Sequence, residues 1–240
     1  MLVDLTHRSN EEELMDQPDV KETDLQVALA DIARVNRWLG GNEITIKAVR
    51  NLLKDRDKEQ EYTILDLGCG NGDMLRQLAD DFRKKGWKGK FIGVDLNEMG
   101  LDQAKALSTA YPEIQFAKKD IITLDATDFS CDIVICTLTL HHLSCDEIVK
   151  CMENSIALAA IGVVINDLHR SALAYYLFKV FSFFFIKGHI AKNDGLVSIK
   201  RGFTKLELNE YAKQLSTSNS DIGWKWAFRY KWIVNTQNNN

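Results

Sequence analysis

The chain has 240 residues, a formal net charge of −4 and a hydrophobic content of 45%. This composition predicts one soluble globular domain with a sizeable core, and the acidic balance argues against nucleic-acid binding by phosphate neutralisation. The five cysteines form no CxxC pair. Their odd number suits a reducing compartment better than a disulfide framework, so we expect a cytoplasmic protein with no metal site.

The start of the chain, MLVDLTHRSNEEELMD, lacks the basic and then apolar order of a signal peptide. Residues 1 to about 20 are acidic and polar, and we expect them to be loosely ordered. Apolar residues at helical spacing then predict a helix from Thr23 to Leu39, which Gly40 and Gly41 end.

A second helix is expected over Ile44–Lys54, and the charged run KDRDKEQE at 54–61 predicts a solvated linker. We therefore expect two parts. Residues 1–58 form an N-terminal helical extension that serves as a lid, and residues 59–240 form the main domain.

The main domain alternates between short apolar strands and helices. The predicted strands are Thr63–Leu67, Phe91–Asp95, Ile114–Ala117, Asp132–Cys136 and Gly162–Asp167. The helices between them are Gly72–Lys84, Met99–Ala110 and Asp146–Ala159. This alternation predicts an α/β fold with a doubly wound, mostly parallel sheet covered on both faces.

The last third of the chain is less regular. Ser171–Ile186 is predicted to be helical, and Thr204 with Glu207 has the spacing of a capping box. Trp224–Val234 reads as one or two strands that close the sheet, with a turn around Arg229. With these strands we expect a seven-stranded, Rossmann-like sheet.

A glycine loop follows the first strand of the main domain, in the stretch LDLGCGNGD. Gly68, Gly70 and Gly72 allow a sharp turn and a close approach of the backbone to a ligand. A dinucleotide fold would require a third glycine where this chain has Asp73, whose carboxylate would repel a pyrophosphate. The G-x-x-x-x-G-K-[ST] phosphate loop is absent.

Acidic residues also end the next two strands. Asp95 follows the second strand, where a carboxylate can accept hydrogen bonds from both hydroxyls of a ribose. Asp120 follows the third strand and can accept from an adenine amino group, with Ile121 packed on the ring. Because the carboxyl ends of parallel strands meet at one edge, these side chains are expected to converge on one crevice.

The segments ILDLGCGNG, GVDLNEMGL, AKKDI and DIVICTLTLHHL together resemble the class I S-adenosylmethionine-dependent methyltransferases over about residues 60 to 170. The resemblance implies S-adenosylmethionine as cofactor and S-adenosylhomocysteine as product. It assigns Asp66, Gly68, Gly70 and Gly72 to the methionine part of the cofactor, Asp95 and Leu96 to the ribose, Asp120 and Ile121 to the adenine, and Thr137 and Leu138 to the wall after the fourth strand.

A second resemblance concerns the acceptor. The stretches ALADIARVNRWLGG, NDLHRSALAYY and NDGLVSIKRGFTKLEL look like bacterial small-molecule methyltransferases near the ubiquinone and menaquinone enzymes. This implies O- or C-methylation of a small aromatic or lipophilic acceptor such as a quinone or phenol, by a monomer or homodimer that binds no nucleic acid.

The candidate catalytic residues are His142, after the fourth strand, and His169, after the fifth. A histidine near neutral pKa can take the proton of a phenol; the alternative for each is a hydrogen-bonded structural histidine. Arg170 and Arg201 can orient an anionic acceptor or pair with Asp167 or Asp194. Arg37 reaches the carboxylate of the cofactor if the N-terminal helix covers the site.

The aromatic residues of Ser171–Ile186 leave several alternatives open. They include Tyr175, which we count among the candidate substrate residues. Aromatic side chains on several helical faces cannot all enter one core. They can pack in the core or in a partner interface, line an apolar tunnel, or make a peripheral contact with a membrane surface.

Two other functions compete with a small-molecule methyltransferase. The first is an RNA or protein methyltransferase, which the acidic charge disfavours for RNA. Amino-methylating enzymes often carry an Asn/Asp-Pro-Pro-aromatic motif after the fourth strand. This chain has TLTLHH there instead, which counts against methylation of an amino group. The second is a catalytically silent, cofactor-binding partner subunit.

Overall fold

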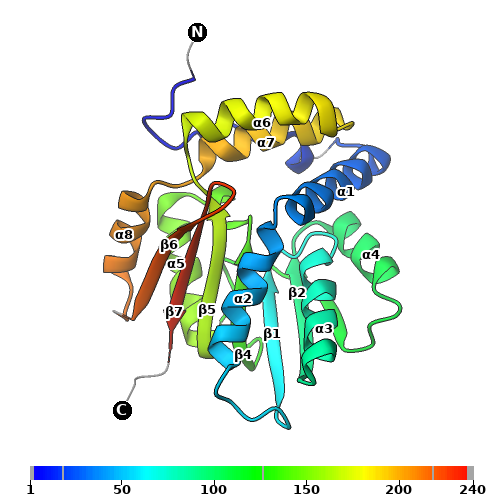
Figure 1. Ribbon diagram of the computed structural model, residues 1–240, viewed down its shortest axis with the longest axis vertical. Coiled ribbons are helices and arrows are strands. Elements are labelled where there is room, and N and C mark those ends of the chain that lie inside the picture. The colour runs from blue at the N-terminus through cyan, green and yellow to red at the C-terminus, as the bar shows by residue number, and fades with distance from the viewer. Residues whose placement is uncertain (1–2, 18, 126, 218, 237–240) are drawn as a thin grey trace.

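A computed structural model of the protein describes residues 3–17, 19–125, 127–217 and 219–236. Its centre is a seven-stranded sheet in the order β3-β2-β1-β4-β5-β7-β6 (Figure 1). The strands are β1 Glu61–Leu67, β2 Lys88–Asp95, β3 Ile114–Lys118, β4 Cys131–Thr137, β5 Ala159–Leu168, β6 Ser220–Lys225 and β7 Arg229–Asn235. Strands β1 to β5 pair in parallel, whereas β7 is antiparallel to both neighbours. The predicted doubly wound, mostly parallel α/β fold is confirmed.

Helices cover both faces of this sheet (Figure 1). The helices are α1 Glu22–Trp38, α2 Gly41–Leu53, α3 Asp73–Lys85, α4 Glu98–Leu107, α5 Cys145–Leu158, α6 Ala172–Phe185, α7 His189–Arg201 and α8 Lys205–Gln214. Residues of α2 and α3 share one hydrophobic core with the sheet, and residues of α5 and α8 share the core on the opposite face. The predicted capping box begins α8, where the Thr204 side chain and Glu207 satisfy each other's backbone N–H groups.

The expected boundary between an N-terminal extension and the main domain, near residue 58, divides the hydrophobic core that α2 and α3 share with the sheet. Ile46, Val49 and Leu53 of α2 are buried against the sheet, together with Ile64 of β1. Helix α2 therefore belongs to the packed body of the main domain, and of the two N-terminal helices only α1 lies apart from the sheet.

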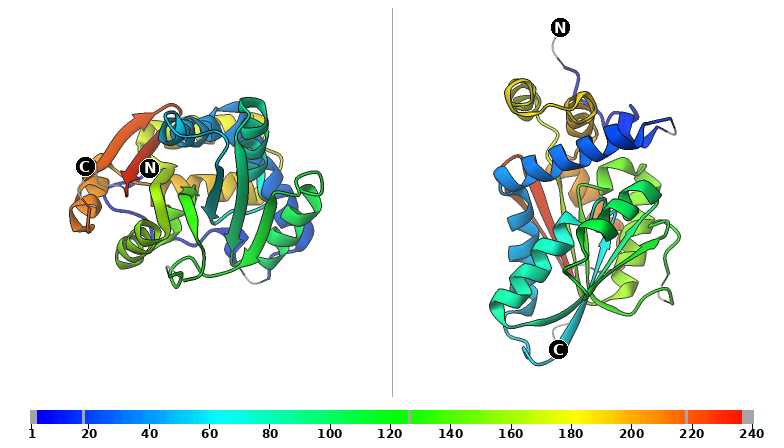
Figure 2. Two further views of the ribbon diagram at one scale, coloured as in Figure 1. Left: turned by 90° about the horizontal axis from the view of Figure 1, so that it is seen from below. Right: turned by 90° about the vertical axis from the view of Figure 1, so that its right-hand side faces the viewer.

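Helices α1, α6 and α7 form an upper layer across the carboxyl ends of the strands (Figures 1 and 2). They share a small apolar core of their own around Ala28, Ile186 and Ala191. The buried carboxylate of Asp31 joins them, because it accepts hydrogen bonds from the backbone N–H groups of Lys187 and Gly188 at the turn before α7. Helix α7 has no counterpart among the sequence-based predictions.

The N-terminal segment is also part of this layer, which corrects the expectation of a loosely ordered start. A short 3-10 helix, η1 Leu14–Asp16, docks on α7, where the Asp194 carboxylate accepts from the backbone N–H groups of Leu14 and Met15 at 2.8 and 2.9 Å. Glu13 is only 2% exposed. Polar side chains, rather than an apolar pattern, hold this segment, so hydrophobic periodicity could not reveal it.

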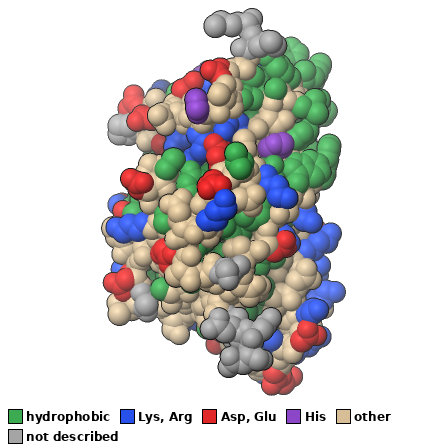
Figure 3. Space-filling model, turned by 90° about the vertical axis from the view of Figure 1, so that its left-hand side faces the viewer, with side chains coloured by type: hydrophobic (Ala, Val, Ile, Leu, Met, Phe, Trp, Pro, Cys, Tyr) green, Lys and Arg blue, Asp and Glu red, His purple; other side chains and the backbone are tan. Residues whose placement is uncertain are grey.

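Helix α6 is the outermost element of the layer, and it presents its aromatic residues to solvent. Figure 3 shows hydrophobic side chains gathered at the upper right, over this helix. Phe183 and Phe184 are 74% and 70% exposed. The opposite face of α6, with Phe178 and Phe181, turns inward. Within the part of the chain that the structure describes, no helix is long and apolar enough to cross a membrane.

Candidate active site

A cavity of about 900 Å³ lies between the upper layer and the carboxyl ends of the strands. Its floor comes from the loops after β1, β2, β3 and β4, and its roof from α1, α6 and α7. The tip of the hairpin between β6 and β7 adds residues 226 to 228 to one wall. Ligands of doubly wound sheets bind in this crevice, and the volume is near the upper end of the usual range for small-molecule pockets.

The glycine loop forms one end of the cavity. Gly68 and Gly70 have φ values of +71° and +51°, which glycine adopts without strain. A Cβ on Gly68 would lie 2.3 Å from Cγ2 of Thr139, so no larger residue fits there. The backbone N–H of Gly70 donates to the Asp95 carboxylate at 2.8 Å, and that of Asn97 donates to its other oxygen at 2.9 Å. Asp95 thus joins the loop to the start of α4.

The side chain of Asp66 faces the same end of the cavity and is 2% exposed. Its carboxylate has no hydrogen-bond partner in the described part of the chain, although polar groups this deeply buried usually have one. Burial, and then the nearby charge of Asp95, raises the pKa of Asp66 well above its ordinary value of 3.8. The site therefore favours a positively charged ligand group beside this carboxylate.

The other floor residues predicted from the sequence lie farther along the same cavity. Leu96, Asp120, Ile121, Thr137 and Leu138 all contribute to its lining. Leu138 has a φ of +57°, a conformation that non-glycine residues rarely adopt and that tends to occur at functional sites. Its backbone N–H donates to the Asn166 carbonyl at 2.9 Å, which fixes the strained residue on β5.

Several predicted site residues lie outside the lining of this cavity. Gly72, Arg37, Arg170, Tyr175, Arg201 and His169 are absent from it. Arg37 pairs with Asp73 at 2.8 Å, in place of the predicted reach into the site. Arg170 is buried against Glu207 at 2.7 Å, which is neither of the two acidic partners considered for it. Gly72 takes a left-handed conformation where α3 begins.

His169 packs against residues of the β6–β7 hairpin. Its Nδ1 accepts a hydrogen bond from Nε1 of Trp224 at 3.3 Å, and its ring stacks on Phe228. Burial, followed by the charge of Arg170, lowers the pKa of His169. Because Phe228 lines the cavity and His169 does not, this imidazole is poorly placed to reach a bound acceptor.

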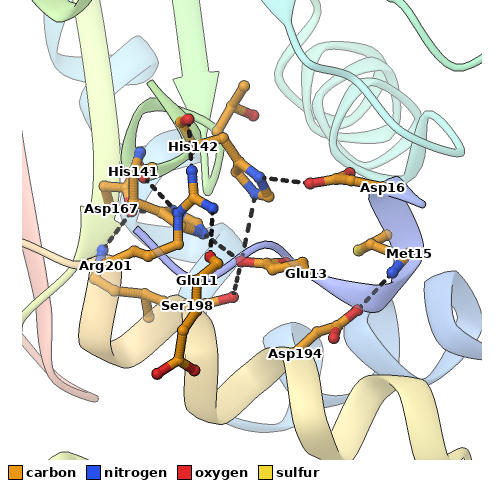
Figure 4. A network of polar contacts seen from close by, with 12 residues as sticks. Glu11, Glu13, Met15, Asp16, His141, His142, Asp167, Asp194, Ser198 and Arg201 are labelled. Atoms are coloured by element: carbon orange, nitrogen blue, oxygen red, sulfur yellow. Dashed lines mark hydrogen bonds and ion pairs between the residues drawn. The ribbon is translucent and has the colours of Figure 1, made fainter. Parts of the chain in front are cut away.

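A polar cluster from the N-terminal segment and the loop after β4 also lines the cavity (Figure 4). Its centre is His141 on the short helix η2 Leu140–His142, with a side chain only 2% exposed. Nδ1 of His141 donates to Asp167 at 2.7 Å, and Nε2 lies 3.5 Å from Oε1 of Glu13. His142 packs beside it, with ring centroids 4.4 Å apart.

The charges within this cluster support one another. Burial alone would lower the pKa of His141, but the carboxylates of Asp167 and Glu13 raise it to about 9. Burial opposes ionisation of both carboxyl groups, yet the interactions with His141 leave the pKa values of Glu13 and Asp167 below their ordinary range. The cluster therefore holds buried charges of both signs.

Two arginines fix the backbone of this loop. Arg201 donates to the carbonyls of His141 and His142 at 3.2 and 2.6 Å. Arg8 donates to the carbonyls of His141 and Leu143, both at 2.9 Å. Arg201 was predicted to bind the acceptor, but in the structure it holds the loop that carries the histidines.

His141, Glu13 and Asp167 were missing from the sequence-based candidates as members of a site. His141 is adjacent to His142, and no pattern in LHHL indicates which ring turns inward. The sequence does place Asp167 at the end of a predicted strand, and this position could have indicated a carboxylate next to the loop after β4. Nothing in the acidic N-terminal stretch distinguishes Glu13 from its neighbours Glu11 and Glu12.

Residues 64–161 match the family model described as "Methyltransferase domain". Among curated proteins, a 2-phytyl-1,4-naphtoquinone methyltransferase of Thermosynechococcus vestitus is 37% identical over 65 residues, which are 27% of this chain and 28% of that protein. A human eEF1A lysine and N-terminal methyltransferase is 27% identical over 131 residues, 54% of this chain and 17% of that protein. The chain thus matches less than a third of the length of either relative.

Among solved structures, the plantazolicin methyltransferase BpumL in complex with S-adenosylhomocysteine superposes with a TM-score of 0.63. The match covers 90% of this chain and 88% of that one, at 13% identity. At this level of identity the likeness shows the fold alone, which is an α/β Rossmann-like methyltransferase fold.

Proposed function

We infer that this chain, whose residues 64–161 form a methyltransferase domain of the class I S-adenosylmethionine-dependent family, methylates a small aromatic or lipophilic acceptor on oxygen or carbon. The observation that carries the proposal is a single roofed cavity with a glycine loop and a free carboxylate at one end, and with two histidines and aromatic side chains farther along.

The residues at the glycine-loop end fit S-adenosylmethionine. Asp66 offers an unpartnered carboxylate to the positive groups of the methionine part, and Gly70 allows close approach of the backbone. Each oxygen of Asp95 accepts one backbone N–H and retains acceptor capacity for a ribose hydroxyl. We assign Asp120 and Ile121, which line the same cavity, to the adenine. When bound, the cofactor would supply a methyl group on its sulfonium sulfur. The acceptor atom would bond to the methyl carbon as the carbon–sulfur bond breaks in line, and S-adenosylhomocysteine would leave as a neutral thioether.

The protein's contribution to such a displacement is chiefly alignment and exclusion of water. Phe178 and Phe181 of α6 and Leu29 of α1 supply an apolar roof for the acceptor. His142 lines the cavity with its side chain 27% exposed, and its Nδ1 lies 3.1 Å from Asp16. An imidazole held in this way can accept the proton of an acceptor hydroxyl.

The exposed face of α6 suggests how a lipophilic acceptor enters. Val180, Phe183 and Phe184 lie on the outer face of the same helix whose inner face roofs the cavity. Exposed aromatic clusters of this kind often mark contact with a membrane or a partner. We propose that α6 makes a peripheral contact with a membrane surface and that α1 acts as a lid beside it.

The test is a transfer assay with methyl-labelled S-adenosylmethionine against quinones, phenols, RNA and peptides. We expect label in the organic-extractable acceptors. Label found only in a protein substrate would favour the alternative suggested by the similarity to the human eEF1A methyltransferase, and label found only in RNA would reverse the acceptor class. Binding of S-adenosylhomocysteine without any transfer would favour a silent partner subunit.

A further inference from the structure

Two histidines and one glutamate converge in the part of the cavity lined by the N-terminal segment and the loop after β4 (Figure 4). Oε1 of Glu13 lies 3.5 Å from Nε2 of His141 and 3.8 Å from Nε2 of His142. The three ligand atoms all lie within 4.8 Å of one another. They come from two distant parts of the sequence, so the fold itself creates this arrangement.

The outer nitrogen of each imidazole is already held by a carboxylate. Nδ1 of His141 lies 2.7 Å from Asp167, and Nδ1 of His142 lies 3.1 Å from Asp16. Metal-binding histidines almost always donate their other ring nitrogen to such a carboxylate or to a carbonyl, which fixes the ring and raises its basicity. Both Nε2 atoms are thereby oriented toward Glu13.

Nε2 of His141 has no hydrogen-bond partner among the described residues, although the side chain is only 2% exposed. The carboxylate nearest to it is 3.5 Å away and is bonded instead to the hydroxyl of Ser198 at 2.7 Å. A buried polar atom without a partner is costly and needs a physical reason. A ligand bound between His141, His142 and Glu13 would provide one.

The spacing fits a metal ion with little rearrangement. Zn²⁺ binds imidazole nitrogen and carboxylate oxygen at about 2.1 Å, so two tetrahedral ligands lie about 3.4 Å apart. The observed separations of 3.5 and 3.8 Å from Glu13 are close to this value. Two imidazoles with one carboxylate also form a donor set suited to divalent transition metals, and it leaves coordination positions open.

The charge balance favours a cation as well. Glu13, Asp16 and Asp167 place three carboxylates around two imidazoles. Within the described residues, no lysine or arginine forms an ion pair with any of the three within 4 Å. Arg8 and Arg201 are bonded to backbone carbonyls, and the buried Arg229 acts on Asp167 from beyond that distance. A divalent ion would neutralise this excess of negative charge.

We propose that Glu13, His141 and His142 bind one divalent transition-metal ion at the acceptor end of the cavity, with Asp167 and Asp16 as the outer partners of the histidines. Metal binding itself does not depend on the proposed methyl transfer, whereas the role of the metal rests on it. The open positions of the ion would hold a hydroxyl or carbonyl oxygen of the acceptor and favour ionisation of a coordinated hydroxyl. Because Nε2 of His142 would then be a ligand, the ion would replace His142 as the group that promotes loss of the acceptor's proton. The acceptor class would then be oxygen-bearing and able to chelate.

The metal site is tested on the full chain, after treatment with a chelator, by titration with Co²⁺ and with Zn²⁺. We expect one equivalent of Co²⁺ to bind with visible absorption bands typical of nitrogen and oxygen ligands, and Zn²⁺ to displace it. Cys145 is the exposed free cysteine and can capture either ion, so the titrations use a Cys145→Ser background.

Variants separate the proposed site from adventitious binding. Glu13→Gln and His142→Ala should each weaken Co²⁺ binding by about 100-fold and alter its spectrum, and Asp167→Asn should weaken it by about 10- to 100-fold. His189→Ala removes an exposed histidine at the start of α7 and should leave binding unchanged. Circular dichroism of each variant verifies the fold, and the less buried His142 keeps the test usable if the Glu13 variant does not fold.

Absence of stoichiometric Co²⁺ binding, or binding that His142→Ala and Glu13→Gln leave unchanged, would overturn the metal site. Neither result affects the binding of S-adenosylhomocysteine at the glycine loop, so the proposed methyl transfer would be judged separately. If Co²⁺ binds but no acceptor is methylated, the metal site is supported and the proposed role of the metal in methyl transfer is overturned.

Discussion

The two ends of the cavity are built by different means. The glycine-loop end, to which we assign the methyl donor and which we call the donor end, consists of strand termini and a glycine loop. Backbone geometry holds this end together, and Asp95 joins its adjacent turns. The end to which we assign the acceptor, here called the acceptor end, is assembled from an N-terminal stretch, the loop after β4 and helices α6 and α7. Side-chain carboxylates and arginines hold these segments together. The first is specified by short motifs at the ends of strands that the sequence displays, whereas the second exists only once the chain has folded. The comparison can be tested from either end.

The largest effect is expected at the donor end from Gly68→Val. A left-handed φ costs a branched residue about 1–2 kcal/mol, and the new Cβ would collide with Thr139. Affinity for S-adenosylhomocysteine, measured by calorimetry, should fall about 100-fold or more. Gly223→Val, at an open position on β6, serves as the control and should bind normally. Unchanged affinity in Gly68→Val would place the cofactor elsewhere.

A comparable loss, confined to turnover, is expected at the acceptor end from His142→Ala. Removing a group that takes a proton typically costs about 100-fold or more in rate. The affinity for S-adenosylhomocysteine should remain within about twofold, since His142 lies away from the glycine loop. His169→Ala is expected to lower the rate much less, because His169 does not line the cavity. If His169→Ala proves the more damaging change, the sequence-based choice of His169 is the better one.

Asp95→Ala should have an intermediate effect. It removes a carboxylate that accepts two backbone hydrogen bonds, each worth about 1.5–3 kcal/mol when the acceptor is charged. Cofactor affinity should fall by about 10- to 100-fold, with a clear loss of thermal stability because two backbone N–H groups lose their acceptor. The matched control is Asp102→Ala, an exposed aspartate on α4. Equal losses in both variants would mean that the effect is not specific to the site.

The pH dependence of stability tests Asp66. Its pKa is raised in the folded protein, so its contribution to the stability of the empty protein is present below pH 3.8 and lost as pH rises through the folded pKa. Asp66→Asn does not titrate, and its melting temperature relative to the native chain should therefore increase from about pH 5 to about pH 8. The same substitution should weaken S-adenosylhomocysteine binding, because the carboxylate for its ammonium group is gone. Parallel melting profiles of the two proteins would exclude the raised pKa.

The smallest effect is expected at the outer face of α6. Replacing Phe183 and Phe184 by serine removes two exposed aromatic side chains, and it should reduce sedimentation with lipid vesicles several-fold. Leu206→Ser, on the exposed surface of α8, should have no such effect. Equal sedimentation of all three proteins would argue against a membrane contact.

The sequence predicted most of the fold and the donor end, because both depend on local patterns. Alternating apolar strands and helices gave the order of the elements, and the glycine spacing with Asp95 and Asp120 placed a nucleoside site at the strand ends. The helix boundaries were close, as for α1, predicted from Thr23 to Leu39 and observed from Glu22 to Trp38.

The acceptor end could not be predicted in the same way. Helix α7 has a polar, weakly periodic sequence, and Glu13 is buried only because Ser198 and Asp194 of that helix receive the N-terminal segment. Arg201 was assigned to the acceptor because of its charge, but it bonds to the carbonyls of His141 and His142. These are contacts between residues far apart in the chain, and they leave no periodic signal in the sequence.

The most direct test of the account is a crystal structure of the protein with S-adenosylhomocysteine. The two-ended cavity predicts the amino-acid part of the ligand beside Asp66 and Gly70, the ribose on Asp95, and the sulfur facing the end that holds His141 and His142. A ligand bound outside this cavity, or one whose sulfur faces away from the two histidines, would contradict it.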